Sequence, residues 1–207
     1  LANVFITSGN GRSRKVEVLL KNLTKFWSWN NAYNSMAGKF VNINMETPHA
    51  AGSDDLIHET EFRLSFLNSD DTPIVLAGFA LAFFDFDQGD TAGDGQECAS
   101  FPVANPDSGI QRIDHITEPA QAGVEVMPDP HATGWTSACS KWVGYGSDNP
   151  HDPEGMDDNQ RAKSVSVVYS DTSSVRFRLS IRGFNGGGRN FVLGGESNLM
   201  PTCAFPS

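Results

Sequence analysis

The chain has 207 residues, of which 39% are hydrophobic and 19% charged, and its formal net charge is −10. Such an acidic surface repels phosphate backbones, so we expect no nucleic acid partner; cations and basic proteins fit it better. No apolar run approaches the roughly 20 residues that a transmembrane helix needs, so we expect no transmembrane segment. The length fits one large β domain, which we assign to residues 1–207.

The first part of the chain carries weak and strong strand patterns. Residues 12–29 begin with a strand-like pattern, and residues 21–29 also fit a short helix. Residues 40–45 alternate weakly between apolar and polar side chains. Residues 61–66 alternate clearly, with Phe62 and two further apolar residues on one face, as a half-buried strand requires.

The middle of the chain contains one fully apolar stretch and a long polar one. Residues 74–86 are apolar on both faces, which predicts a buried central strand, and residues 97–103 predict a shorter strand. The segments 104–133 and 145–160 are rich in proline, glycine and aspartate. We therefore interpret both as long loops, which in compact domains usually serve function or assembly.

The strongest periodicity lies near the end of the chain, in residues 174–182, where four apolar residues alternate with polar and cationic ones. Residues 164–167 alternate in the same way, and residues 171–174 predict a turn, so the pair is interpreted as an antiparallel hairpin. Residues 191–193 form a further short apolar stretch. The whole pattern predicts an all-β sandwich of two mostly antiparallel sheets, with long loops and little helix.

An acidic, glycine-rich loop follows the predicted central strand. Several close carboxylates repel one another unless a cation separates them, and Ca²⁺ takes six to eight oxygen ligands of this kind. The loop departs from the EF-hand pattern at Gly89 and Gln96. An alternative interpretation is a solvated turn whose aspartates cap their own backbone. The predicted Ca²⁺ ligands are Asp85, Asp87, Asp90, Asp94 and Glu97.

Aromatic side chains offer a surface on which a sugar could stack, although tryptophan is more commonly buried in a core. Trp27 and Trp29 would share one face if their stretch is extended. The predicted ligand-binding residues are Trp135, Trp142 and Tyr145. The expected ligand is a glycan or a protein.

The cationic face of residues 174–182 is unusual in so acidic a chain. It is either a solvated outer face or a patch that docks on an acidic loop of another copy, which would give a homo-oligomer. The predicted assembly residues are Arg176, Arg178 and Arg182. Catalytic motifs such as HExxH and GxSxG are absent from the sequence, although its many carboxylates permit the acid pair of a hydrolase.

Three cysteines allow at most one internal disulfide, and buried reduced thiols are the alternative. Residues 22–24, Asn-Leu-Thr, match the N-glycosylation acceptor pattern. An extracellular or organellar lumen location would suit both a disulfide and this pattern.

An ordered set of short motifs resembles a known domain. The set comprises Phe84-Asp85-Phe86-Asp87, Glu97, the sequence GYGSDNPHDP in residues 144–153, Gln160, Ser164-Val165 and Gly188-Arg189-Asn190-Phe191. It is similar to a poorly characterised β-sandwich domain of diatom, dinoflagellate and related algal proteins. The resemblance covers roughly residues 60–200 and implies no catalytic residues. A lattice-forming protein such as the shell proteins around diatom pyrenoids is a more distant resemblance.

Three functions are therefore open. The first is a non-catalytic binding module whose Ca²⁺-stabilised acidic loop presents a surface for a glycan or a protein. The alternative is a structural subunit that assembles into a lattice or shell. The third is a hydrolase that uses paired carboxylates.

Overall fold

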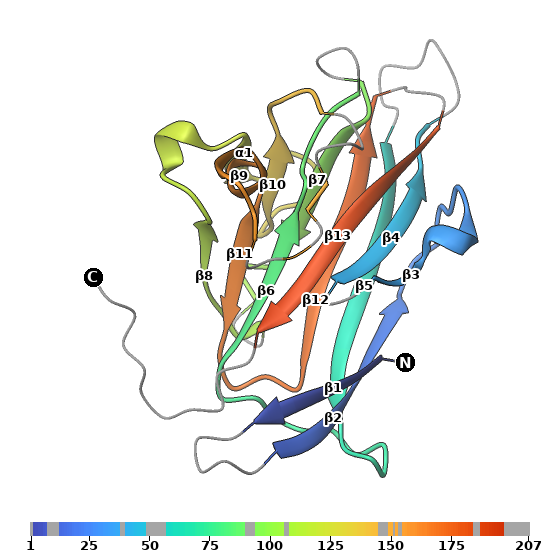
Figure 1. The fold of residues 1–207 in the computed structure, drawn as a ribbon, viewed down its shortest axis with the longest axis vertical. Helices are drawn as coiled ribbons and strands as arrows, with labels where there is room; N and C mark the ends of the chain where they lie inside the picture. The colour runs from blue at the N-terminus through green and yellow to red at the C-terminus, as the bar shows by residue number, and fades with distance from the viewer. Residues whose placement is uncertain are drawn as a thin grey trace.

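Two antiparallel sheets face each other in the computed structural model, with the six-stranded sheet nearer the viewer in Figure 1. This arrangement confirms the predicted all-β sandwich. The structure describes residues 2–7, 13–37, 40–48, 57–89, 94–105, 108–144, 149–150, 152, 155–183 and 187–196.

Each sheet combines strands that are far apart in the sequence. The seven-stranded sheet has the order β1 (Ala2–Thr7), β2 (Ser13–Asn22), β5 (Ile57–Leu67), β12 (Ser174–Arg182), β7 (Gln96–Phe101), β10 (Thr136–Ser140) and β9 (Val124–Pro128). The six-stranded sheet has the order β3 (Ser35–Ala37), β4 (Phe40–Glu46), β13 (Gly188–Glu196), β6 (Phe79–Phe84), β11 (Val165–Tyr169) and β8 (Ile110–His115).

Helix is scarce in the described residues. It comprises the 3-10 turns η1 (Asn31–Tyr33) and η3 (Pro119–Gln121) and the helix α1 (Asp158–Ala162), which Asp157 and Gln160 cap reciprocally. None of the described helices has the length and apolar character that crossing a membrane requires.

The predicted hairpin of residues 164–182 is wrong. β11 pairs with β6 and β8 in one sheet, whereas β12 pairs with β5 and β7 in the other. The predicted turn does exist, with Asp171 in the left-handed region at φ 48°. It carries the chain from one sheet to the other, so both strands point their apolar faces into the same core. A period of two predicts which face of a strand is buried, but it does not predict which strand pairs with it.

Other boundaries also differ from the prediction. Residues 21–29 form no helix, because β2 continues to Asn22 and an irregular segment follows. Within residues 74–86 only Phe79–Phe84 is a strand. The predicted loop 104–133 contains β8 and β9, whereas the described part of 145–160 contains only the start of α1.

The core confirms the predicted faces of β12. Its four inward residues, Val175, Phe177, Leu179 and Ile181, are at most 1% exposed. Phe177 stacks on Phe62 of β5 with ring centroids 5.6 Å apart and meets Phe83 of the opposite sheet edge-on at 5.3 Å. Aromatic rings therefore join the two layers.

A disulfide links the neighbouring strands β7 and β10. Cys98 and Cys139 stand directly opposite each other in the ladder, and both are at most 1% exposed. The structure thus decides between the two predicted cysteine states for this pair. Cys203 lies outside the described residues.

Candidate functional site

The acidic loop with the predicted Ca²⁺ ligands runs from the end of β6 to the start of β7. Asp85, Asp87 and Glu97 are buried, and Asp85 has a left-handed backbone with φ 63°. Asp94 is half-buried, and Asp90 lies outside the described residues. The loop therefore brings three of its five acids into the protein interior.

Arg189 of β13, the neighbour of β6 in the six-stranded sheet, lies between the carboxylates of Asp87 and Glu97. Its guanidinium pairs with Asp87, donates through Nε to Glu97 Oε1 at 3.0 Å and donates to the carbonyl oxygen of Gln88 at 3.1 Å. The backbone N–H of Asp87 donates to Glu97 Oε2 at 3.3 Å. One arginine thus clamps the loop to both sheets through charge-assisted hydrogen bonds.

Burial is the largest cause of the pKa shifts of Glu97 and Arg189. It raises the pKa of Glu97 well above the ordinary value of 4.5; the negative charge of Asp85 adds to the rise, and Lys163 opposes it. Burial also lowers the pKa of Arg189, and Asp85 opposes that change. Lys163 is itself buried, so two cations and three acids share one region of low dielectric.

Arg189 supplies between Asp87 and Glu97 a positive charge of the kind that was predicted to come from Ca²⁺. Within the described residues, His, Cys, Asp and Glu side chains form no group of three that could hold a metal ion. Ca²⁺ binding by the whole loop stays a prediction, because Asp90 is not among these residues.

The three arginines predicted to mediate assembly lie on the outer face of β12, and each faces an acid of the same chain. Arg176 pairs with Glu61, Arg178 lies 3.6 Å from Glu61, and Arg182 lies 4.0 Å from Asp129. Their charges are therefore matched within the molecule, and self-assembly through this face stays a prediction.

The predicted ligand-binding tryptophans occupy different environments. Trp135 lies against Arg178, whose guanidinium carbon is 3.8 Å from the ring centroid, in a cation–π contact. Trp142 packs over Gly123 and is 39% exposed. Tyr145 lies outside the described residues. No ring contact of the described residues joins Trp135 to Trp142.

Trp29 provides a more exposed platform, on a segment that crosses from one sheet to the other. The N–H of Leu23 donates to the carbonyl of Glu61 in β5, and the N–H of Glu46 in β4 donates to the carbonyl of Trp27. A Cβ added at Gly188 would lie 2.5 Å from Cδ1 of Trp29, so the indole rests directly on the backbone of β13. Trp29 is nevertheless 49% exposed.

Asparagine side chains hold this platform in place. Asn44 Oδ1 accepts from the N–H of Asn30 at 2.8 Å, and Asn44 Nδ2 donates to Asn190 Oδ1 at 2.7 Å. Asn34 Oδ1 accepts from the N–H of Asn44 at 2.8 Å, while Asn30 Oδ1 caps η1. The network fixes the turn that leads to Tyr33, which is 56% exposed.

Several hydrogen-bonding groups remain open on the two segments, the Trp29 turn and β13, that meet at the indole. The amide NH₂ groups of Asn30, Asn31 and Asn190 donate to no described residue, although their oxygens accept hydrogen bonds. We call the group of Trp29, Asn30, Asn31, Tyr33 and Asn190 the Trp29 surface. It combines exposed aromatic rings with unused donors.

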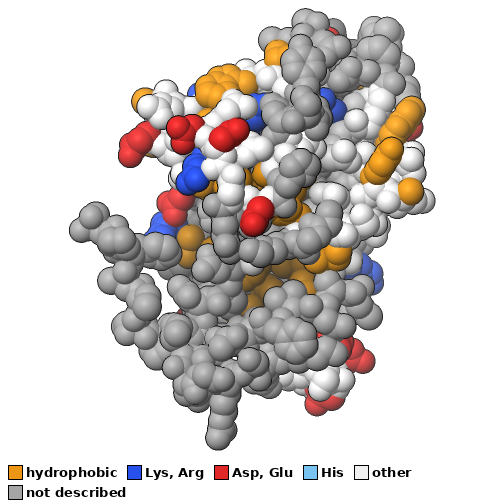
Figure 2. Space-filling view, viewed as in Figure 1, with side chains coloured by type: hydrophobic (Ala, Val, Ile, Leu, Met, Phe, Trp, Pro, Cys, Tyr) orange, Lys and Arg blue, Asp and Glu red, His pale blue; other side chains and the backbone are white. Residues whose placement is uncertain are grey.

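Charge is nearly absent from this part of the chain. Between Lys25 and Glu46 the sequence contains a single charged residue, Lys39, in a protein that is 19% charged. Figure 2 shows the corresponding side of the molecule, where the surface over β3 and β4 is mostly white, the colour of the backbone and of uncharged polar side chains, and hydrophobic side chains are exposed at the edge. The Trp29 surface therefore suits an uncharged ligand.

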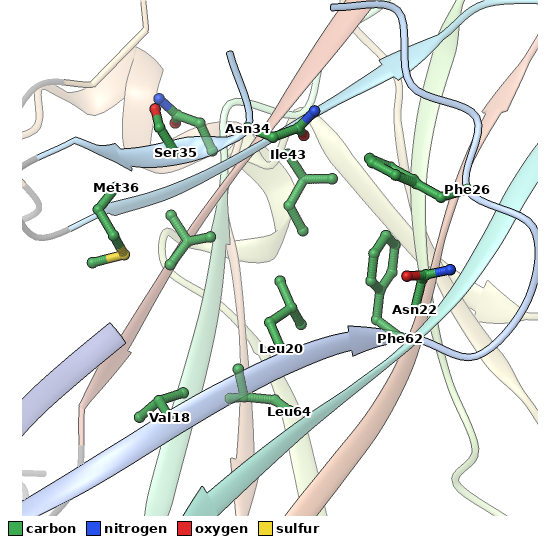
Figure 3. A pocket seen from close by; sticks show the side chains of 12 residues that line it. Val18, Leu20, Asn22, Phe26, Asn34, Ser35, Met36, Ile43, Phe62 and Leu64 are labelled. Atoms are coloured by element: carbon green, nitrogen blue, oxygen red, sulfur yellow. The ribbon is translucent and has the colours of Figure 1, made fainter. Parts of the chain in front are cut away.

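An apolar cavity of about 300 Å³ opens between the sheets on the inner side of β3 and β4 (Figure 3). Leu20 of β2 and Phe62 of β5 line it from one sheet, and Ile43 of β4 lines it from the other. Phe26 and Asn22 stand on the side where β2 ends. None of its lining residues is charged.

Sequence reasoning named Trp29 as a candidate for sugar stacking but could not separate it from a core tryptophan. The asparagine network joins residues from β4 and β13 that are 146 positions apart, so no local pattern reveals it. The sparse charge of residues 26–45 is the one signal that could have singled out this surface. Arg189 stands in the motif Gly188-Arg189-Asn190-Phe191 of the resemblance, but that motif did not indicate its partners.

Comparisons with known proteins add little to this geometry. No protein-family model and no curated protein matches the chain. One solved structure, described as "AvmM Catalyzes Macrocyclization in Alchivemycin A Biosynthesis", is similar at 13% identity over 78% of this chain and 80% of that chain, with a TM-score of 0.23. This low score supports no conclusion about either fold or function.

Proposed function

We propose that the protein is a non-catalytic binding module that holds neutral glycans on the Trp29 surface. The observation that carries the proposal is the indole of Trp29, which rests on Gly188 and is still 49% exposed. A pyranose ring has an apolar face of C–H groups that packs on an aromatic ring. A ring already fixed in place loses little conformational entropy when a sugar stacks on it.

The amides beside the indole would recognise the sugar hydroxyls. A hydroxyl both donates and accepts, so the open NH₂ groups of Asn30, Asn31 and Asn190 match its oxygen. The turn that carries Asn30 and Asn31 is held by Asn34 and Asn44, which preorganises these donors. The low local charge favours a neutral ligand, and the net charge of −10 disfavours anionic polysaccharides.

Affinity electrophoresis tests the proposal with three neutral polysaccharides, a β-glucan, a mannan and a xylan, and with anionic alginate. We expect retardation by at least one neutral polymer and none by alginate. Trp29→Ala should weaken binding about tenfold or more, because an aromatic ring that the bound sugar covers commonly contributes about 1.4 kcal/mol or more to binding.

Trp142→Ala is the matched control, since Trp142 also packs over a glycine and is 39% exposed. We expect this variant to bind as the wild type does. Loss of binding in Trp142→Ala with retention in Trp29→Ala would move the site to the tryptophans predicted from the sequence. A wild-type protein that binds only alginate, or no polymer of the panel, would contradict the proposal.

A further inference from the structure

A strand end, a modification pattern and an open cavity meet at Asn22. Asn22 is the last residue of β2 and is exposed, and it begins the acceptor pattern Asn22-Leu23-Thr24. Leu20 and Asn22 share one face of β2, as the period of two requires. Figure 3 shows the Asn22 amide at the side of the apolar cavity, next to Phe26 and Phe62.

We propose that Asn22 carries an N-linked glycan and that its first sugar covers the mouth of this cavity. The donor is an oligosaccharide joined through a diphosphate to a lipid, and an oligosaccharyl transferase brings it to the chain. A bond forms between Asn22 Nδ2 and the anomeric carbon, while the bond from that carbon to the diphosphate oxygen breaks. The diphosphate leaves with the electron pair of the broken bond, and the amide releases one proton.

The folded structure accommodates this modification. Asn22 Nδ2 donates to the carbonyl oxygen of Thr24 at 2.9 Å, and a glycosylated amide keeps one N–H for the same hydrogen bond. Thr24 Oγ1 accepts from the backbone N–H of Glu61 at 2.9 Å, so the residue that completes the acceptor pattern is fixed against β5. Asn22 is exposed and ends β2, so its amide is accessible from solvent.

The apolar cavity explains why a sugar at this position would matter. Phe26 is half-buried and packs edge-on against Phe62, with ring centroids 5.8 Å apart. An open apolar hollow of about 300 Å³ leaves this surface in contact with water, which is unfavourable. The C–H face of a sugar attached to Asn22 can pack on Phe26 and remove part of that contact.

The disulfide is consistent with a location in the compartment where this chemistry occurs. The Cys98–Cys139 bridge is fully enclosed by the fold, and disulfides persist in the oxidising secretory lumen and outside the cell. Oligosaccharyl transfer takes place in the same lumen. The disulfide and the acceptor pattern are independent features, and both fit a secreted or luminal protein.

The test is secretion of the full chain from a eukaryotic host, followed by intact mass and peptide mapping before and after peptide-N-glycosidase treatment. We expect a glycan on the peptide that contains residue 22. The glycosidase should remove this glycan and convert Asn22 to aspartate. Thr24→Ser should keep the glycan because a hydroxyl remains, whereas Asn22→Gln and Thr24→Val should lose it. A folded, secreted wild-type protein with an unmodified Asn22 would overturn the proposal.

Binding of the dye 8-anilinonaphthalene-1-sulfonate tests whether the sugar covers the cavity. We expect several-fold more fluorescence with Asn22→Gln, or with the enzymatically deglycosylated protein, than with the glycosylated wild type. Far-UV circular dichroism checks that each protein is folded. Equal fluorescence with and without the glycan would overturn the covering role. Polysaccharide binding by Asn22→Gln should equal that of the wild type, because the Trp29 surface lies on the outer side of β4. The two proposals can therefore fail independently of each other.

Discussion

At the scale of single residues, Arg189 provides the positive charge that pairs with the buried carboxylates of the acidic loop. The sequence shows a cluster of carboxylates and predicts that a cation separates them. The structure supplies a guanidinium from β13, which contacts Asp87 and Glu97. This partner lies 92 positions from Glu97, so the cluster could be predicted from the sequence but its counter-charge could not.

Replacement of Arg189 should be strongly destabilising. Arg189→Met leaves buried carboxylates without their partner, and such a loss costs about 3–5 kcal/mol of unfolding free energy. The matched control is Arg112→Met, which breaks a surface pair with Asp114 whose side chains are 54% and 43% exposed. That change should cost about 1 kcal/mol or less. Urea unfolding measures both, and equal costs would show that the clamp contributes no more than a surface pair.

Asp129 should make the stability of the protein depend on pH. Burial alone raises its pKa, but hydrogen bonds from the His131 N–H and the hydroxyls of Ser137 and Ser100, together with the charge of Arg182, hold it below the ordinary value of 3.8. A depressed pKa gives stability that is present above the unfolded pKa and is lost as pH falls through the folded pKa. We expect Asp129→Asn to destabilise the protein most at neutral pH, by about 1.5–3 kcal/mol. This difference should shrink below about pH 4 in urea unfolding, and a constant difference would contradict the assignment.

At the scale of elements, the strand faces were predictable and their partners were not. The alternation in β12 records which residues meet the core, and the structure confirms it. The same alternation in β11 suggested a hairpin, whereas the two strands lie in different sheets. β8 and β9 were missed because proline and glycine in residues 104–133 masked two short strands. Short strands take much of their stability from pairing, which a local pattern does not record.

The faces of the central strands can be tested by a pair of substitutions. Phe177→Ala removes a ring that contacts both sheets and should cost about 3–5 kcal/mol. Arg63→Ser changes an exposed residue of β5, directly opposite Arg176, and should stay within about 0.5 kcal/mol. Chemical unfolding measures both values. Similar costs for the two changes would contradict the inward and outward assignment.

The β7–β10 disulfide should contribute measurably to stability. Cys98 and Cys139 are 41 positions apart, and closing a loop of this length stabilises a protein by about 4 kcal/mol in the chain-entropy model. We expect the double change Cys98→Ala and Cys139→Ala to lower the urea midpoint, with the far-UV spectrum retained. A midpoint equal to that of the wild type would show that the bridge does not constrain the unfolded chain.

At the scale of the whole molecule, an acidic protein carries one nearly uncharged region. The net charge of the chain is −10, whereas residues 26–45 offer aromatic rings and amides with a single charge among them. The sandwich brings Gly188 and Asn190 of β13 beside this region. The candidate site is thus a product of the sheet order, which places distant segments side by side.

The most direct test of the Trp29 surface follows the indole N–H signals of the four tryptophans in a ¹⁵N–¹H spectrum. Single substitutions of each tryptophan assign the signals. A neutral oligosaccharide taken from the polymer that binds best is then titrated into the protein. We predict that the Trp29 signal shifts in a saturable manner while those of Trp135 and Trp142 stay in place. Saturable shifts of Trp142 without movement of Trp29 would contradict the account.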